Sequence, residues 1–381
     1  MQRGFFLGED QRIFRESLRR WLDERWSQSE RRRLAASDPG YSREIWAGLA
    51  EIGALGAFLP ERVDGAGGGG LDLMLTMEVF GRVLFRSPYL WTVAVCGPLL
   101  AVSGKRGDEL LGQIVRGDVV VTAALAEARS RYDLQHVEMR AERRGKGYLL
   151  SGSKSAVPYA AAAGWVLLPA RTSGEARDMR GITLFLVEVD RKELDLRPFA
   201  TADGGRAADL TLRNIEVDAD GVLGEPGEGL KPLQRAVDLA ILAQCAEAVG
   251  SMRTLLDSTV AYAKARQQFG ATLGSFQALQ HRMVDMFATT EMAASRVQAA
   301  LARISGIEDP VDPRDAVAVK LQVDTASRLV GQEAVQIHGG MGMTDDLDVG
   351  HHFKRLTSMA LTFADRGKLN ERYRDLQRSS P

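Results

Sequence analysis

The sequence has few of the residues on which disulfide, metal and membrane chemistry depend. Its 381 residues include 2 cysteines and 5 histidines. Cys96 and Cys245 stand in apolar surroundings, which predicts two small buried side chains rather than a disulfide and suits a reducing compartment. No apolar run approaches the length of a membrane span, and the first residues contain no signal-peptide hydrophobic region. We therefore expect a cytoplasmic protein without membrane contact.

The chain also lacks an excess of charge of either sign. Its 49 lysines and arginines nearly balance 50 aspartates and glutamates, for a formal net charge of −1. This balance argues against a nucleic-acid partner, which requires a basic surface. We interpret the local run Arg31-Arg32-Arg33 as a solvated helix face, with binding of a phosphate or a partner protein as the alternative. His338, His351 and His352 come without a cluster of carboxylates or cysteines, so we expect no metal site.

Hydrophobic periodicity divides the chain into three blocks. Residues 1–117 repeat their apolar side chains at helical spacing, for example from Asp10 to Glu24. Residues 118–222 consist of short apolar runs separated by Gly, Asp and Arg, which predicts antiparallel strands in a small barrel or sandwich. Residues 223–381 return to the helical period in segments long enough for a four-helix bundle, including one helix from Val349 to Gln377. The expected fold class is α+β with three domains.

Two motifs in the last block have the chemistry to bind a dinucleotide. Arg266 to Gly270 reads Arg-Gln-Gln-Phe-Gly at the end of one long helix, and Gln277 begins the next helix. Gln336 to Gly342 reads Gln-Ile-His-Gly-Gly-Met-Gly after a third helix. An arginine offers a fixed cation to a pyrophosphate, and glycines allow backbone N–H groups to approach it closely. Either motif alone is compatible with an ordinary helix end, but the pair in this order predicts a binding site.

With four further motifs, these features resemble the acyl-CoA dehydrogenase family over nearly the whole chain. The motifs are Leu59 to Gly68, Glu78 with Gly81-Arg82, Gly152-Ser153-Lys154, and Asn214 to Gly229. The resemblance implies an α-domain, a β-domain and a helical bundle, with FAD as cofactor, an acyl-CoA as substrate and electron-transfer flavoprotein as electron acceptor. It also implies that Glu127 belongs to a flavin-facing loop and that six residues reach across a subunit interface to a neighbour's FAD: Arg266, Phe269, Gln277, Gln336, Gly339 and Gly340.

The reaction that the resemblance implies is α,β-dehydrogenation of a thioester. A carboxylate removes the α-proton while a hydride leaves the β-carbon for the flavin. The two positions that the family uses for this carboxylate hold no acid here, since one falls at Phe363 and Ala364 and the other at Ala240. Asp365 is the nearest carboxylate and is our candidate base, with a surface aspartate paired with a neighbouring arginine as the alternative. Asp238 is a second candidate.

The middle block departs from the family pattern as well. The loop that lines the flavin in most members reads Ala126 to Ser130 here, and the segment that follows Lys154 contains Ala156-Val157-Pro158. Alanine cannot stack against a flavin, and proline has no N–H to offer it. Because the bundle motifs are kept, the chain is most similar to the smaller subunits of heteromeric enzymes of the pimeloyl-CoA and steroid side-chain type.

Three functions remain open at this point. The chain is expected to be a subunit of an FAD-dependent acyl-CoA dehydrogenase, in a homo- or hetero-oligomer that is a dimer or a tetramer. The second function is that of a non-catalytic partner that completes the FAD site of a sister subunit. The third is that of a flavoprotein oxidase or monooxygenase on the same scaffold. Small residues at Ala240, Ala243 and Ala246 predict room for a bulky acyl group.

Overall fold

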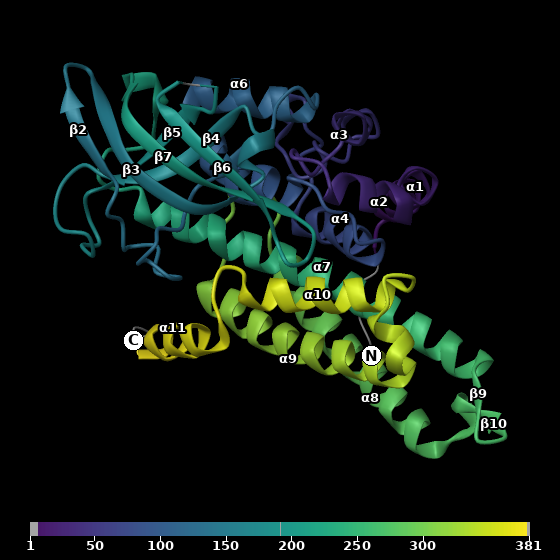
Figure 1. The fold of residues 1–381 in the computed structure, drawn as a ribbon. Helices are drawn as coiled ribbons and strands as arrows, with labels where there is room; N and C mark the ends of the chain where they lie inside the picture. Colours follow the sequence, from purple (N-terminus) through teal and green to yellow (C-terminus); the bar gives the residue numbers. More distant parts are fainter. Residues whose placement is uncertain (1–6, 191, 379–381) are drawn as a thin grey trace.

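The computed structural model describes residues 7–190 and 192–378, which form an amino-terminal helical domain, a β-domain and a bundle of long helices (Figure 1). The central element is α7 (Leu230–Ala265). It packs against helices of the amino-terminal domain on one side and against the other bundle helices on the other. The α+β fold class with a helical, a β and a helical domain is confirmed.

The amino-terminal domain consists of short amphipathic helices. Serine side chains begin two of them, because Ser27 Oγ accepts the N–H of Glu30 and Ser42 Oγ accepts the N–H of Ile45. The helices are α1 (Glu9–Arg25), α2 (Gln28–Ala35), α3 (Arg43–Glu51), α4 (Gly70–Arg82), the π-helical segment η2 (Leu90–Cys96), α5 (Gly97–Ala101) and α6 (Gly104–Val115).

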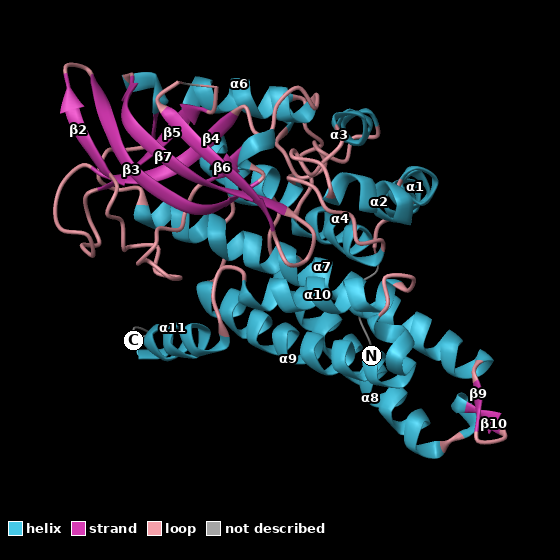
Figure 2. Ribbon diagram, in the orientation of Figure 1, coloured by secondary structure: helices cyan, strands magenta, loops and turns pink. Residues whose placement is uncertain are grey.

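The β-domain holds one curved sheet (Figure 2). Its strand order is β6-β7-β3-β2-β4-β5-β8, and β1 pairs with β4. The strands are β1 (Val121–Ala123), β2 (Arg140–Arg144), β3 (Gly147–Pro158), β4 (Trp165–Arg171), β5 (Ile182–Glu188), β6 (Leu194–Ala200), β7 (Arg206–Val217) and β8 (Val222–Leu223). The expectation of purely antiparallel strands is wrong at β4, which pairs in parallel with β1 and, through Arg140 and Arg171, with β2. Parallel neighbours require a long connection, and other strands intervene in sequence in both cases.

The bundle contains α7, α8 (Gln277–Leu301), α9 (Pro313–His338) and α10 (Asp348–Leu361), followed by α11 (Arg366–Arg378). A two-stranded hairpin, β9 (Gln267–Gln268) and β10 (Ala271–Thr272), lies between α7 and α8 at the far end of the bundle (Figure 1). The expected single helix from Val349 to Gln377 is wrong. Phe363 has a φ of +65°, which an α-helix does not tolerate, so the chain turns there and separates α10 from α11.

By length and hydropathy alone, α7 could cross a membrane. Its most apolar 18-residue window has a mean hydropathy of 1.2. However, 83% of that window is buried inside the protein. The apolar composition is explained by packing, since a helix surrounded by others on all sides has no polar face.

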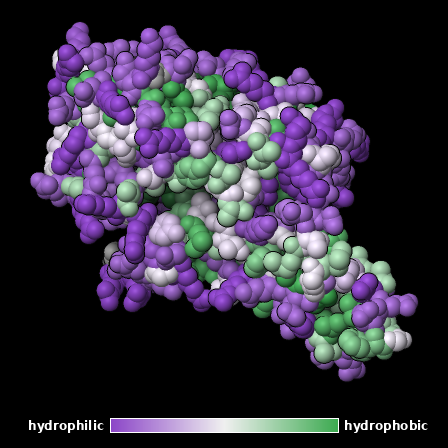
Figure 3. Space-filling model, viewed as in Figure 1, coloured by the Kyte–Doolittle hydropathy of each residue, from purple (hydrophilic) through white to green (hydrophobic). Residues whose placement is uncertain are grey.

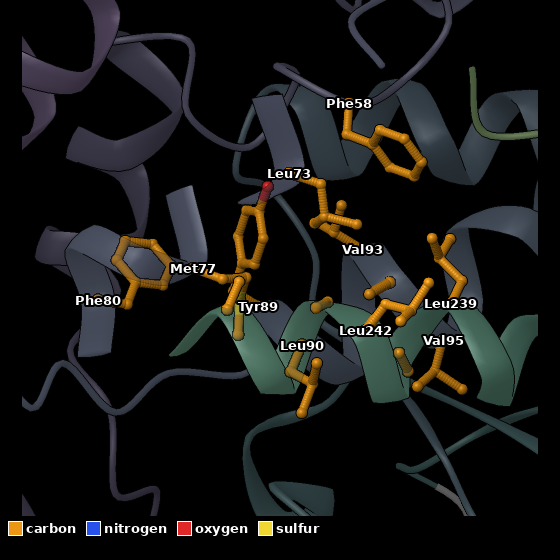
Figure 4. Close-up of a cluster of buried hydrophobic side chains, with 14 of the residues drawn as sticks. Phe58, Leu73, Met77, Phe80, Tyr89, Leu90, Val93, Val95, Leu239 and Leu242 are labelled. Atoms are coloured by element: carbon orange, nitrogen blue, oxygen red, sulfur yellow. The ribbon is translucent and has the colours of Figure 1, made fainter. Parts of the chain in front are cut away.

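The main hydrophobic core joins the amino-terminal helices to α7 (Figure 4). Phe80 of α4 meets Tyr89 edge-on, with ring centroids 5.2 Å apart. The helices α4 and α7 touch through glycines, because a Cβ at Gly81 or at Gly250 would collide with a main-chain carbonyl of the other helix. Cys96 and Cys245 are buried and unpaired, as expected.

The arginine run in α2 is only partly solvated. Arg31 is 6% exposed and forms an ion pair with Asp348 of α10, whereas Arg33 is exposed and pairs with Glu30. Successive helical residues point about 100° apart, so one member of the run faces the bundle while its neighbours face solvent. The interpretation of the whole run as a solvated face is therefore wrong at Arg31.

Candidate functional site

A cavity of about 410 Å³ lies where the three domains meet. Its volume is within the range of small-molecule sites. Apolar side chains of η2, α7 and the turn after α10 form one part of its wall, namely Leu90, Trp91, Val237, Leu361 and Phe363. The β-domain contributes the residues after β1, the end of β3 and the β6–β7 turn, including Ala126, Ala156, Pro158, Tyr159 and Asp203.

A buried charge network supports one side of this cavity. Arg355 of α10 donates to Asp203 at 2.6 Å and, through two nitrogens, to Glu247 of α7 at 2.8 Å each. Burial opposes ionisation of Asp203, but Arg355 and a hydrogen bond from Thr201 outweigh it and lower its pKa to about 2. Arg86 lies close by, and burial lowers its pKa. The network thus joins the β-domain to the helical bundle.

A second feature, which we call the tip surface, lies at the opposite end of the bundle. It comprises the end of α7, the β9–β10 hairpin, the start of α8, and the end of α9 with the turn that follows it. The six residues that were predicted to reach a neighbour's cofactor all lie on this surface: Arg266, Phe269, Gln277, Gln336, Gly339 and Gly340. All six are exposed, and Phe269 is 90% exposed. Tyr262 stacks on His338 with ring centroids 4.3 Å apart, which holds the end of α7 to the end of α9.

The tip surface is also apolar. Large hydrophobic side chains that are exposed there or beside it on α8 are Phe269, Val284, Phe287, Met341 and Met343. Figure 3 shows apolar residues gathered at this end of the molecule. An exposed apolar patch of this kind is typical of a protein–protein contact.

Comparisons with known proteins assign the chain to a family. Residues 8–117, 122–217 and 227–363 match, in turn, the amino-terminal, middle and carboxyl-terminal domains described as acyl-CoA dehydrogenase. The chain belongs to the acyl-CoA dehydrogenase family. Its members are oxidoreductases that act on acyl-CoA, and the family binds FAD.

Individual relatives of this acyl-CoA dehydrogenase are distant but span its length. Acyl-CoA dehydrogenase IpdE2 of Mycobacterium tuberculosis is 27% identical over 348 residues, covering 91% of each chain. Mitochondrial isovaleryl-CoA dehydrogenase of Pongo abelii is 26% identical over 359 residues, covering 91% of this chain and 84% of the relative. The solved ChsE4-ChsE5 complex from Mycobacterium tuberculosis superimposes with a TM-score of 0.87 at 25% identity, covering 99% of this chain and 100% of that one.

The candidate base, Asp365, lies at the start of a helix. The Asp365 carboxylate accepts the backbone N–H of Lys368 at 2.9 Å, in the manner of an N-cap of α11. Asp365 lines two neighbouring cavities, whereas Phe363 lines the 410 Å³ cavity itself. Tyr132 borders both the 410 Å³ cavity and one cavity that Asp365 lines, and therefore stands between the two. Asp365 remains a prediction that requires this segment to move.

The other positions considered for the base hold either a buried alanine or an aspartate that is paired with an arginine. Ala240 is fully buried in the core, and Ala364 packs in a small cluster with Leu369. Asp238 accepts two hydrogen bonds from Arg372 at 2.6 and 2.8 Å, which joins α7 to α11. Ala243 and Ala246 are likewise buried in the core rather than lining the cavity, so the expectation that they leave room for a bulky group is wrong.

Glu127 serves the β-domain. Its carboxylate accepts from Lys154 Nζ at 2.7 Å and from the backbone N–H groups of Glu138 and Met139 at 2.6 and 3.2 Å. Lys154 is fully buried, so the pair and its main-chain partners form a closed buried unit. The side chain of Glu127 is therefore occupied within its own domain, and a contact with a flavin remains a prediction for the main chain of this loop.

The residues of the tip surface suit FAD better than those of the β-domain wall do. The tip surface offers an exposed guanidinium at Arg266 and two glycines, Gly339 and Gly340, with open space around their α-carbons. The β-domain wall offers less, since the N–H of Ala156 is donated to Asp209 at 2.9 Å and Pro158 has none. The fit is good for a clamp on a cofactor held by another chain.

The histidines lie apart from any metal-binding arrangement. His338 and His352 are buried, and their Nδ1 atoms lie 2.8 Å from Ala334 O and 2.7 Å from Ser251 Oγ, respectively. Within residues 7–190 and 192–378, no group of three or more His, Cys, Asp or Glu side chains could hold a metal ion.

Sequence reasoning missed several residues of the cavity. Trp91, Tyr159 and Gln244 line it, yet none belongs to a motif that was singled out. For Gln244 a signal was present, because it is a polar residue in the otherwise apolar run from Leu239 to Ala246. For the others, only the packing of three domains brings the residues together.

Proposed function

We propose that this chain is a subunit of a flavin-dependent acyl-CoA dehydrogenase whose FAD site is shared between two chains. The tip surface of one chain would hold the FAD of its neighbour through Arg266, Gln277 and the turn from Gln336 to Gly340. When bound, FAD accepts the hydride from the β-carbon of the acyl thioester. The acceptor expected from the family is electron-transfer flavoprotein.

One observation carries this proposal: the clamp residues lie at the carboxyl-terminal end of α7, far from the cavity. Gln244, which lines the cavity, lies 22 residues before Arg266, which directly follows α7. At a rise of 1.5 Å per residue, the separation is about 33 Å along the helix axis. The exposed apolar side chains beside Arg266 support contact with a second chain.

The same proposal extends to a heteromeric assembly, with this chain as the smaller subunit. The absence of a carboxylate at the usual base positions supports it, as does the likeness to the ChsE4-ChsE5 complex. Two carboxylates line the cavity, Asp133 and Asp203, and Asp203 is held by Arg355. This arrangement favours the alternative in which the chain completes a sister subunit's FAD site without turnover of its own.

The shared site is tested by the FAD content of purified assemblies. Arg266→Ala should lose FAD, with affinity reduced tenfold or more, because a charge-assisted contact to the pyrophosphate is removed. Lys264→Ala, at an exposed position two residues earlier, is the matched control and should keep its FAD. Unchanged FAD content in Arg266→Ala would rule out the clamp.

Catalytic competence is tested separately by anaerobic addition of an acyl-CoA to the chain expressed alone and with a sister subunit. Bleaching of the flavin by the chain alone supports a self-sufficient enzyme, and Asp365→Asn should then abolish bleaching if Asp365 is the base. A colourless chain that gains FAD only in the mixed assembly supports the non-catalytic alternative.

A further inference from the structure

The side-chain oxygen of Gln244 is buried without a partner. The residue is 4% exposed, it lines the 410 Å³ cavity, and its Oε1 makes no hydrogen bond to the part of the chain that the structure describes. Burying an amide without a hydrogen bond costs roughly 1–3 kcal/mol. Such a group calls for an explanation, and a ligand that enters the cavity can supply the missing partner.

Several other buried polar groups around the cavity are already engaged. Arg355 bonds to Asp203, and Thr201 donates to the same carboxylate. Among the described residues that line the cavity, the buried side-chain atoms without a partner are Gln244 Oε1 and Arg206 Nε. Arg206 directs another nitrogen to the carbonyl of Ala35, 3.0 Å away in the amino-terminal domain. Gln244 Oε1 is thus a buried acceptor on the cavity wall that the described part of the chain leaves unpaired.

The surroundings of Gln244 restrict what that partner can be. Leu90, Trp91, Val237, Leu361 and Phe363 give the cavity hydrocarbon walls. A hydrocarbon ligand fills such walls, and a single oxygen on it would satisfy the amide. Because the side-chain oxygen and nitrogen of glutamine are interchangeable by rotation, either a hydroxyl or a carbonyl would serve.

We infer that Gln244 determines substrate specificity by hydrogen-bonding a hydroxyl or keto oxygen on the acyl chain, away from the thioester. The inference rests on the proposed function, and it adds that the acyl group enters this cavity. A plain alkyl chain would leave the amide unpaired, and sites with a polar group built for a substrate oxygen reject analogues that lack it. The substrate class is therefore an oxygenated acyl-CoA.

The test compares Gln244→Leu with wild type on matched acyl-CoA pairs. Each pair has a plain alkyl chain and the same chain with a hydroxyl or keto group, placed at successive carbons beyond the β-carbon. Flavin reduction is followed anaerobically in the FAD-containing assembly. Wild type should favour one oxygenated member tenfold or more in kcat/KM, and Gln244→Leu should lose that preference through slower reaction of the oxygenated member alone. Gln298→Leu, the same substitution on α8 outside this cavity, should behave as wild type.

Two further readouts do not depend on turnover. Without ligand, Gln244→Leu should not lower Tm, because the amide oxygen has no hydrogen bond within the described chain to lose. The thermal shift produced by the oxygenated acyl-CoA should shrink in this variant, while the shift produced by the plain chain should not. These measurements test the inference even if no acyl-CoA is oxidised. A complete lack of oxidation would count against the proposed catalytic function and not against the role of Gln244.

Three results would overturn the inference. An equal loss of kcat/KM on plain and oxygenated chains would place the amide at the thioester. Loss of FAD from Gln244→Leu would make the cofactor its partner. Equal treatment of every matched pair by wild type would remove the specificity that the residue is inferred to confer.

Discussion

The indole of Trp91 and the ring of Phe363 lie 5.2 Å apart between centroids, at an interplanar angle of 39°, and both line the cavity. Trp91 belongs to η2 of the amino-terminal domain, whereas Phe363 is in the turn between α10 and α11. Phe363 is also one of the two positions to which the family spacing assigns a carboxylate. An aromatic contact between domains therefore occupies the place of an acid.

The first prediction concerns this contact. Phe363→Ala should lower the free energy of unfolding by about 1–3 kcal/mol, because it removes a partly buried ring and the contact of that ring with Trp91. Exposure of the Trp91 indole should shift tryptophan emission to longer wavelength. Urea denaturation followed by fluorescence measures both effects. Phe287→Ala, which removes a ring that is 55% exposed, is the control and should change neither.

Arg355 provides a second prediction. Arg355→Met leaves Asp203 and Glu247 buried without their cation, and it should destabilise the protein by about 3–5 kcal/mol in urea denaturation. Arg303→Met breaks an exposed ion pair with Asp315 and should cost at most about 1 kcal/mol. A similar small loss in both variants would mean that the network contributes little to joining the domains.

The third prediction concerns pH. Burial lowers the pKa of His352 to about 3, from an ordinary value near 6.5. The unfolded chain therefore binds a proton between these values that the folded chain does not bind. The resulting stability is fully present above pH 6.5 and decreases by about 1.4 kcal/mol per unit as the pH falls towards 3.

The variant His352→Gln isolates this contribution, because glutamine can still hydrogen-bond Ser251 but does not titrate. Between pH 6.5 and pH 5, the free energy of unfolding measured by urea denaturation should decrease by about 2 kcal/mol less in this variant than in wild type. His281→Gln, at an exposed position of α8, should reproduce the wild-type loss. An unchanged difference between the two pH values in His352→Gln would contradict the assignment.

The fourth prediction concerns assembly through the tip surface. A charge placed in an apolar contact weakens association because it must be desolvated. Phe269→Asp combined with Val284→Asp should therefore shift the molar mass, measured by light scattering, towards the 41.6 kDa of one chain. Met179→Asp alters a residue that is 70% exposed on the β-domain and should leave the mass unchanged. The same mass for all three proteins would place the interface elsewhere.

The arrangement of helices and strands was largely readable from the sequence, because apolar spacing changes with the secondary structure. The tip surface could also be anticipated, since Arg266 and the Gln336 to Gly340 motif stand at the ends of neighbouring helices. The break at Phe363 could not, because a residue with a side chain at positive φ leaves no compositional mark.

The cavity was harder to anticipate. Its charge network combines Asp203, Glu247 and Arg355 from three segments whose meeting depends on tertiary packing. The role of Asp365 as an N-cap was equally hidden, since Val349 to Gln377 reads as one continuous helix. The sequence shows Gln244 as a polar residue within an apolar run, but only the structure shows that it lines a cavity.

The separation of cavity and tip along one rigid helix has a genetic consequence. If each complete site takes its cavity from one chain and its clamp from another, damage at the two ends of α7 affects different sites. A chain damaged only in the cavity still offers an intact tip to its neighbour, and a chain damaged only at the tip still offers an intact cavity. Two inactive variants, produced together, should therefore complement each other and restore part of the lost activity.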